Sequence, residues 1–287
     1  RKLIKGMLDT TLKIVNEPKR PTDWNNINWC KANRVVHNLR QRIFRAKQEG
    51  AHKKVRSLQR LMLKSYSNTL LSVRRVTQQN KGSTTAGIDK LVIKTPKARG
   101  ELVDKLETYQ PCKAKPVKRV FIPKSNNKFR PLGIPTVVDR CMQAKVKNAL
   151  EPEWESIFEG ISYGFRPKRG CHDAIQAIFS LANARGNKKW VIDADIKGAF
   201  DNIDHDFLLE LIEKFPARGL IKQWLKAGYV EKSITHPTNS GTPQGGIISP
   251  LLANIALHGM EKAIGVKRDN RYRLIGERAI VRYADDF

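Results

Sequence analysis

The chain has 287 residues, and its 54 Lys and Arg against 27 Asp and Glu give a formal net charge of +27. A hydrophobic content of 40% is that of a globular protein and excludes a disordered tail. The positive charge predicts a polyanionic partner, with nucleic acid before an anionic membrane. No apolar run is long enough to span a bilayer, and the four cysteines lack the spacing of a zinc site. We therefore expect an intracellular protein with reduced thiols.

The positive charge is concentrated in residues 1–80, which hold 19 Lys and Arg against 4 Asp and Glu. Apolar periodicity predicts one helix over 31–49 and a second from His52 to Val73. A charge run is usually a solvated helical face, but solubility is better served by mixed charge than by so one-sided an excess. We therefore favour a basic helical N-terminal extension that binds RNA. Its candidate contact residues are Arg34, Arg40, Arg42, Arg45, Lys47, Lys53 and Lys54.

Residues 118–135 alternate basic and apolar side chains around an Asn-Asn turn. This pattern predicts a β-hairpin whose return strand ends at Ile134. Lys124 and Arg130 flank the turn and can converge on one anion, which suits a triphosphate. Surface hairpins often carry Lys and Arg as well, so the spacing alone leaves both interpretations open.

Two loops carry side chains suited to ligand contact. Residues 162–174 form a Gly/Pro loop that enters a helix ending near Ala182, and it is either a surface loop or a contact for a nucleic-acid backbone. Residues 241–250 combine glycines and prolines around Gln244, so the backbone can approach a ligand closely while the amide hydrogen-bonds to it. The basic residues of the first loop are Arg166, Lys168 and Arg169.

The remaining elements follow from periodicity and from Gly and Pro positions. The sequence predicts a polar loop over 80–87, helices over 97–108, 137–150 (opened by Thr136, closed near Pro152), 207–215, 220–229 and 250–264, and hairpin strands over 271–286.

Two apolar segments end in carboxylates. Residues 190–196 predict a buried strand in which Trp190 belongs to the core and Asp195 is followed by the strand-breaking Gly198. Residues 279–283 predict a second strand that leads into Asp285 and Asp286. We expect Asp195, Asp285 and Asp286 to meet around magnesium, which prefers oxygen ligands. The other nearby acids, Asp193, Asp201 and Asp204, are expected to be strand-end or capping residues.

This set of groups suits nucleotidyl transfer. Two Mg²⁺ ions about 4 Å apart activate an attacking 3′-hydroxyl and stabilise the departing pyrophosphate oxygen. A basic hairpin neutralises charge that develops on the phosphates. The expected substrate is a deoxynucleoside triphosphate.

Six ordered stretches resemble reverse transcriptases, and most closely the reverse transcriptase/maturases encoded by group II introns. PQG followed by YADD and preceded by DIKGAFD is a specific combination, whereas YADD alone is weak. The resemblance covers nearly everything from residue 30 onward. The stretches are NKGSTTAGID (80–89), IPKSNNKFRPLGIPTVVDR (122–140), SYGFRPKRGCHDAI (162–175), DADIKGAFDNIDH (193–205), GTPQGGIISPLLANI (241–255) and YADDF (283–287).

The resemblance implies roles for individual residues. Asp195 and Asp285 match the metal-binding pair, Asp286 matches the third catalytic carboxylate, and the Ile196 carbonyl matches a further metal ligand. Phe200 matches the steric gate that clashes with a ribonucleotide 2′-hydroxyl. The residues that match those holding the incoming nucleotide are Lys124, Arg130 and Gln244.

The implied fold is α+β: the fingers and palm of a right-hand polymerase, with an antiparallel palm sheet packed on helices. The implied domains are a basic helical extension (1–80), fingers with part of the palm (81–185) and a palm with the catalytic acids (186–287). The implied partners are intron RNA, an RNA template with a DNA primer and, through C-terminal regions absent here, target DNA. We expect a ribonucleoprotein in a bacterial cytoplasm or an organelle, with a homodimer left open.

The sequence ends one residue after YADD, so we expect a fragment whose activity without a thumb is doubtful. The expected function of the parent is RNA-directed DNA synthesis together with maturase binding of intron RNA. One alternative is a non-catalytic RNA-binding splicing cofactor with a relict polymerase fold. Another is a related bacterial reverse transcriptase of a defence or diversity-generating system.

Overall fold

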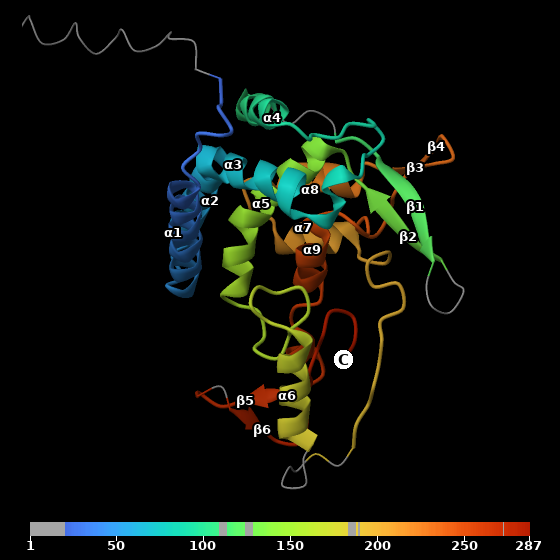
Figure 1. Ribbon diagram of the computed structural model, residues 1–287. Coiled ribbons are helices and arrows are strands. Elements are labelled where there is room, and N and C mark those ends of the chain that lie inside the picture. The colour runs from blue at the N-terminus through green and yellow to red at the C-terminus, as the bar shows by residue number, and fades with distance from the viewer. Residues whose placement is uncertain (1–20, 109–113, 124–128, 183–187, 189, 272) are drawn as a thin grey trace, which may run out of the picture.

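The computed structural model describes residues 21–108, 114–123, 129–182, 188, 190–271 and 273–287. A helical body carries a small sheet on one side, and α6 with β5 and β6 extends away from it (Figure 1). The helices are α1 (Trp29–Gln48), α2 (His52–Lys64), α3 (Tyr66–Arg74), α4 (Pro96–Thr108), α5 (Val137–Glu155), α6 (Cys171–Ala182), α7 (His205–Leu211), α8 (Arg218–Leu225), α9 (Ser249–Ala256) and α10 (Met260–Ala263), with a π turn at Arg75–Gln79 and a 3-10 turn at Lys81–Thr84. The strands are β1 (Val117–Pro123), β2 (Phe129–Ile134), β3 (Tyr229–Glu231), β4 (Ile234–His236), β5 (Lys267–Arg268) and β6 (Leu274–Ile275).

The first helix confirms the predicted apolar face, because Val36, Leu39, Ile43 and Ala46 are all buried. The predicted stop at Gly50 is also confirmed. Gly50 has a φ of +67°, its N–H donates to the carbonyl of Lys47, and the N–H of Ala51 donates to that of Ala46. This pair of bonds caps the last carbonyls of α1 in the Schellman arrangement.

The single helix predicted from His52 to Val73 is wrong, since the chain breaks at Ser65 between α2 and α3. Ser65 has an extended backbone with a ψ of 121°, and its hydroxyl accepts the N–H of Asn68. A serine hydroxyl competes with the helical hydrogen bonds and favours the start of a new helix. The apolar stripe therefore continues across two helices.

Helix α5 is the centre of the helical body, where α1, α2, α3, α4 and α9 all contact it. Thr136 caps its start as predicted, but the expected end near Pro152 is wrong, because α5 continues to Glu155. The last turn is held from α1: Arg40 pairs with Glu151 at 2.5 Å, and Lys47 pairs with Glu153 at 3.1 Å. These ion pairs offset the backbone hydrogen bond that the proline cannot make.

The predicted hairpin is confirmed as the antiparallel pair β1–β2. It belongs to a four-stranded sheet in the order β2-β1-β3-β4, in which β1 and β3 are parallel. The four-stranded sheet is therefore mixed, whereas β5 and β6 form a separate antiparallel pair. The helix predicted through Tyr229 instead ends at Leu225, and Gly228, with a φ of +78°, leads into β3. A side chain at Gly228 would lie 2.4 Å from the His236 carbonyl oxygen, so the turn requires glycine.

The buried strand predicted over 190–196 is wrong. The side chains of Trp190, Val191 and Ile192 are 94%, 75% and 86% exposed, and this stretch forms no strand. An apolar, β-branched run is buried only where a neighbouring strand or helix covers it, and no described element does so here. Trp190 is therefore not a core residue.

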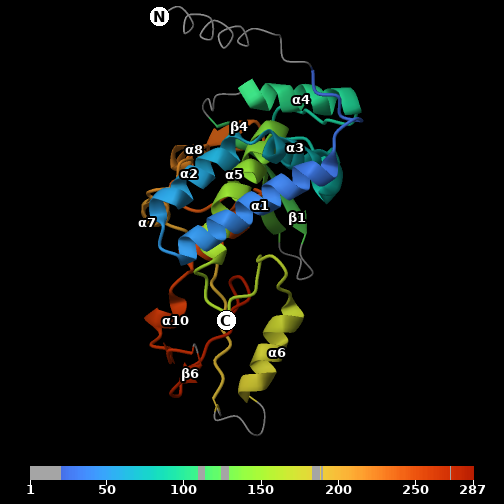
Figure 2. The same ribbon diagram turned by 90° about the vertical axis from the view of Figure 1, so that its left-hand side faces the viewer.

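The C-terminal helix predicted to Ile264 is divided into α9 and α10 by Gly259, which has a φ of +99°. In the view of Figure 2, α1 crosses the front of the helical body, and the C-terminus lies below that body, between α10 and α6. None of the helices in the described residues is both long and apolar enough to cross a membrane.

Cys141 on α5 yields a test of this packing. Burial raises the pKa of its thiol from 9.0 to about 12, with Arg140 opposing the shift. In a variant whose other cysteines are serine, Cys141 should react with a disulfide reagent about 1000-fold more slowly in the native state than in urea, because the thiolate is the nucleophile. Equal rates with and without urea would contradict the packing.

The same shift has a pH consequence. The unfolded chain releases the thiol proton at lower pH than the native chain, so the free energy of unfolding should fall as pH rises from about 9 toward 12. Urea unfolding across this range measures the slope, and Cys141→Ala is the control in which this contribution disappears.

Candidate active site

Two chain segments pair through their backbones and bring acidic residues together. Ala194 and Phe287 exchange both N–H to carbonyl bonds at 2.9 Å, and the Ile196 N–H donates to the Asp285 carbonyl at 3.2 Å. Asp195 therefore lies directly opposite Asp286 in an antiparallel bridge. In such a pair, the two side chains project to the same face and lie close together.

The acids Asp285 and Asp286 belong to a two-residue hairpin turn. The N–H of Tyr283 donates to the Asp286 carbonyl at 2.8 Å, and the Asp286 N–H returns a bond of 3.1 Å. Ala284, the first central residue, has a φ of +62°, whereas Asp285 has none in the positive range. This is the pattern of a type II′ turn, in which glycine usually occupies the first central position. The turn therefore holds its acids in a specific backbone conformation.

The carboxylates of this site repel one another. Partial desolvation raises the pKa of Asp286, and the charges of Asp285, Asp195 and Asp193 raise it further. Among the described residues, no three His, Cys, Asp or Glu side chains converge closely enough to form a ready-made metal site. Carboxylates that repel one another at a paired strand end nevertheless fit a hard divalent cation, which binds oxygen and relieves the repulsion.

A second group of predicted residues forms a hydrogen-bonded line. Arg130 Nε donates to Gln244 Oε1 at 2.8 Å, and Gln244 Nε2 lies 3.3 Å from Asp201 Oδ2. Gly133 of β2 also donates to the Gln244 carbonyl, which joins the Gly/Pro loop to the hairpin. The predicted partner of Arg130, Lys124, lies outside the described residues.

The predicted steric gate, Phe200, is buried, with 7% of its surface exposed. Its ring meets that of Phe165 edge to face, with centroids 5.9 Å apart. The Phe200 carbonyl accepts the N–H of Thr242 at 2.7 Å, which places this ring beside the loop that carries Gln244.

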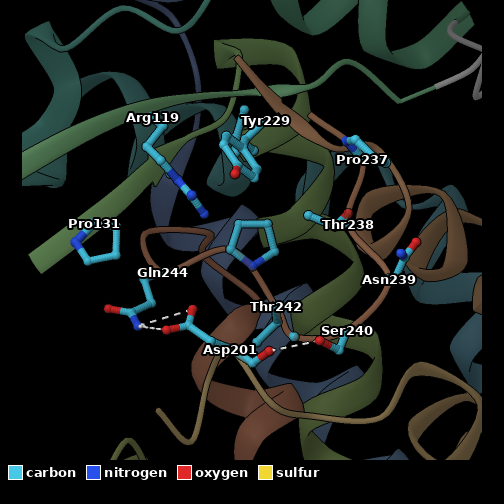
Figure 3. A pocket seen from close by; sticks show the side chains of 14 residues that line it. Arg119, Pro131, Asp201, Tyr229, Pro237, Thr238, Asn239, Ser240, Thr242 and Gln244 are labelled. Atoms are coloured by element: carbon cyan, nitrogen blue, oxygen red, sulfur yellow. Dashed lines mark hydrogen bonds between the residues drawn. The ribbon is translucent and has the colours of Figure 1, made fainter. Parts of the chain in front are cut away.

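A cleft of about 390 Å³ lies between the sheet and the loop that carries Gln244 (Figure 3). The guanidinium of Arg119 lies 3.3 Å from the centroid of the Tyr229 ring, which also stacks on His236 with centroids 4.9 Å apart. No sequence motif singled out Arg119, Tyr229 or His236. The available signal was the alternation along β1, which places Arg119 on the opposite face from its two neighbours.

The basic residues of the N-terminal helices divide into two groups. Arg40 and Lys47 face α5 and are paired with its acids, so they contribute to internal packing. Arg34, Arg42 and Arg45 are exposed. Lys53 and Lys54 are exposed too, with Lys54 3.4 Å from Glu49.

The basic loop before α6 divides in the same way. Arg166 is buried: its guanidinium pairs with Glu155 at 2.9 Å and donates to the carbonyls of Glu159 and Ser162 at 2.7 and 2.8 Å. All three nitrogens of this buried guanidinium donate to internal acceptors, so Arg166 is an internal residue rather than the predicted RNA contact. Arg169 donates to the Gly160 carbonyl, while Lys168 is exposed.

The protein-family comparison identifies the fold that carries these acids. A model described as "Reverse transcriptase (RNA-dependent DNA polymerase)" matches residues 122–287, which is more than half of the chain. The chain belongs to the reverse transcriptase family. A second model, the "N-terminal domain of reverse transcriptase", matches residues 24–106. Members of this family generally use a divalent metal ion and deoxynucleoside triphosphates.

Curated relatives agree with this assignment. This reverse transcriptase is 44% identical over 194 residues to the "Group II intron-encoded protein LtrA" of Lactococcus lactis, covering 64% of the chain and 31% of that protein. It is 37% identical over 223 residues to "Protein YkfC" of Escherichia coli, covering 71% of the chain and 57% of that protein. "Maturase-like protein 1" of Euglena gracilis is 27% identical over 255 residues, covering 88% and 55%. The chain thus spans about a third to just over half of the length of these relatives.

The internal position of Arg166 predicts a stability effect. Arg166→Gln should lower the free energy of unfolding by about 3 kcal/mol, because it leaves the Glu155 carboxylate without its buried partner. Lys168→Gln, two residues away and exposed, is the matched control and should change it by less than about 0.5 kcal/mol. Urea unfolding measures both variants, and equal effects would contradict the assignment.

Proposed function

We propose that this reverse transcriptase is the RNA-directed DNA polymerase of a group II intron and also binds the intron RNA as a maturase. The observation that carries the proposal is the pairing of Asp195 with Asp286 inside the region that the reverse transcriptase model matches. The similarity to LtrA, named as group II intron-encoded, supports the intron assignment. The alternative of a non-catalytic splicing cofactor is not favoured, because it gives no reason to keep mutually repelling acids in register.

The residues proposed to hold two Mg²⁺ ions are Asp195, Asp285 and the carbonyl of Ile196, with Asp286 as the third catalytic carboxylate. The Ile196 carbonyl accepts the Ala199 N–H at 3.1 Å, and its second lone pair is available to a cation. Bound magnesium would activate the primer 3′-hydroxyl and stabilise the departing pyrophosphate. The turn and the paired strand would orient the carboxylates for that task.

Four residues are proposed to hold the incoming deoxynucleoside triphosphate. Arg130 and Lys124 would bind its phosphates, and a guanidinium suits this because its planar donors match phosphate oxygens. Gln244 would lie beneath the nucleotide, oriented by Arg130 and Asp201. Phe200 would exclude the 2′-hydroxyl of a ribonucleotide, and its contact with Phe165 would fix the ring.

The RNA surface is proposed to be the exposed side of α1 and α2. Spacings of 3 and 8 residues place Arg34, Arg42 and Arg45 on one side of α1, away from the face that packs on α5. Exposed basic residues neutralise phosphates without disrupting the core. Lys53 and Lys54 of α2, together with Lys168 and Arg169 of the loop before α6, extend this set. The paired or buried Arg40, Lys47 and Arg166 are no longer part of it.

The proposed organisation places the basic extension at 1–80, fingers with part of the palm at 81–185 and the palm at 186–287. The proposed nucleic-acid partners of the whole protein are intron RNA, an RNA template, a DNA primer and target DNA. The oligomeric state, including a homodimer, is left to measurement.

The metal assignment predicts that Asp195→Asn reduces DNA synthesis by at least about 100-fold, because a neutral amide binds magnesium far less well than a carboxylate. The measurement is primer extension on an RNA template by the natural protein that carries these residues. Asp204→Asn is the control: Asp204 caps α7 by accepting the Phe207 N–H at 2.7 Å, and asparagine caps equally well. Full synthesis by the Asp195 variant would overturn the assignment.

The RNA surface predicts a salt effect. The logarithm of the affinity for single-stranded RNA falls as the logarithm of the salt concentration rises. Replacing Arg34, Arg42 and Arg45 by Gln should make this negative slope less steep by about 2. The matched control replaces three exposed lysines elsewhere, Lys90, Lys94 and Lys97, and changes the net charge equally. Equal slopes for the two triple variants would assign the effect to net charge alone and contradict the surface.

A further inference from the structure

A buried arginine lies immediately before the acidic turn. Arg282 is 2% exposed, and among the described residues no carboxylate forms an ion pair with it. Burial lowers its pKa, opposed by the charge of Glu159 and assisted by that of Arg166. Because removing an unpaired cation from water is costly, the buried guanidinium needs compensating contacts.

The compensation comes from neutral oxygens on separate segments. Arg282 Nη1 donates to the carbonyl of Ala284 at 2.9 Å and to Asn254 Oδ1 of α9 at 3.1 Å. Arg282 Nη2 donates to Ser162 Oγ at 2.7 Å. The guanidinium therefore joins the turn, α9 and the loop before α6.

One of these hydrogen bonds, from Arg282 to the Ala284 carbonyl, contacts the residue whose positive φ defines the turn. Ala284 has a φ of +62°, a backbone region that glycine adopts readily and that residues with a Cβ rarely adopt. Such a conformation persists only where contacts with the surrounding structure hold it in place. Arg282 holds the peptide group between Ala284 and Asp285, so it acts on the orientation of the first acid.

The other side of the turn is closed by Gly164. A Cβ at Gly164 would lie 2.2 Å from the Ala284 nitrogen, so the two backbones are in direct contact. Asn254, which accepts from Arg282, also donates to the Gly164 carbonyl at 2.8 Å. The turn is thus enclosed by one connected network of Arg282, Asn254 and Gly164.

We propose that Arg282 is a positioning residue that fixes the Ala284 turn and thereby orients Asp285 and Asp286 toward Asp195 for divalent-cation binding. The inference rests on the proposed polymerase function and deepens it. A lysine cannot replace the arginine, because an ammonium lacks the planar fork that reaches Ala284, Asn254 and Ser162 at once.

The test is Mn²⁺ binding to this chain, measured by electron paramagnetic resonance of the free ion, which requires no catalytic activity. Arg282→Lys and Arg282→Ala should weaken Mn²⁺ binding by about tenfold, the order expected when hydrogen bonds from a charged group are lost. Millimolar guanidinium should restore binding to Arg282→Ala by occupying the vacated site. Arg278→Ala is the matched control, because Arg278 is exposed and donates to the Ile264 carbonyl at 2.8 Å, away from the turn.

The outcomes separate this inference from the proposed function. If Asp195→Asn leaves Mn²⁺ binding unchanged, the metal site itself is wrong. If Asp195→Asn weakens binding while the Arg282 variants bind as the wild type does, the metal site stands and the positioning role is overturned. Circular dichroism verifies that each variant folds. If the Arg282 variants do not fold, Mn²⁺ binding is measured instead on Ser162→Ala, which removes one acceptor of Arg282 but keeps the arginine. A smaller loss of affinity in Ser162→Ala supports the proposal, and no loss contradicts it.

Discussion

The backbone pairing of Ala194 with Phe287 is the contact on which the acidic site depends. It joins segments that are far apart in the sequence and sets Asp195 opposite Asp286, although like charges in such a pair repel. Hydrogen bonds of the backbone, rather than attraction between side chains, therefore bring the acids together. The repulsion that remains is the property that makes the site selective for a cation.

The molecule uses different forces in its two parts. The helical body around α5 is held by a continuous apolar core. Near the acidic turn, regular secondary structure is sparse, and buried arginines satisfy the carbonyls that a sheet or helix would otherwise pair. Arg166 organises the loop before α6, and Arg282 connects that loop to the turn. Guanidinium groups thus fix the acidic turn and the loop that packs against it.

Structure that is determined by local sequence signals could be predicted. The apolar face of α1, the stop at Gly50 and the β1–β2 hairpin follow from periodicity and turn residues, and the structure has all of them. Burial and side-chain roles that depend on residues distant in the sequence could not be predicted. Trp190 is exposed because no described element covers it, and Arg166 is internal because Glu155 lies beside it. The register of Asp195 against Asp286 likewise depends on long-range pairing, so the sequence could predict only that these acids meet.

The same register has an evolutionary consequence. Along an extended segment, inserting or deleting one residue sends every following side chain to the opposite face. A change of length next to Asp195 would turn its carboxylate away from Asp286, whereas substitutions at the exposed Val191 and Ile192 leave the pairing in place. Homologous sequences should therefore vary in composition through this segment while its length stays constant.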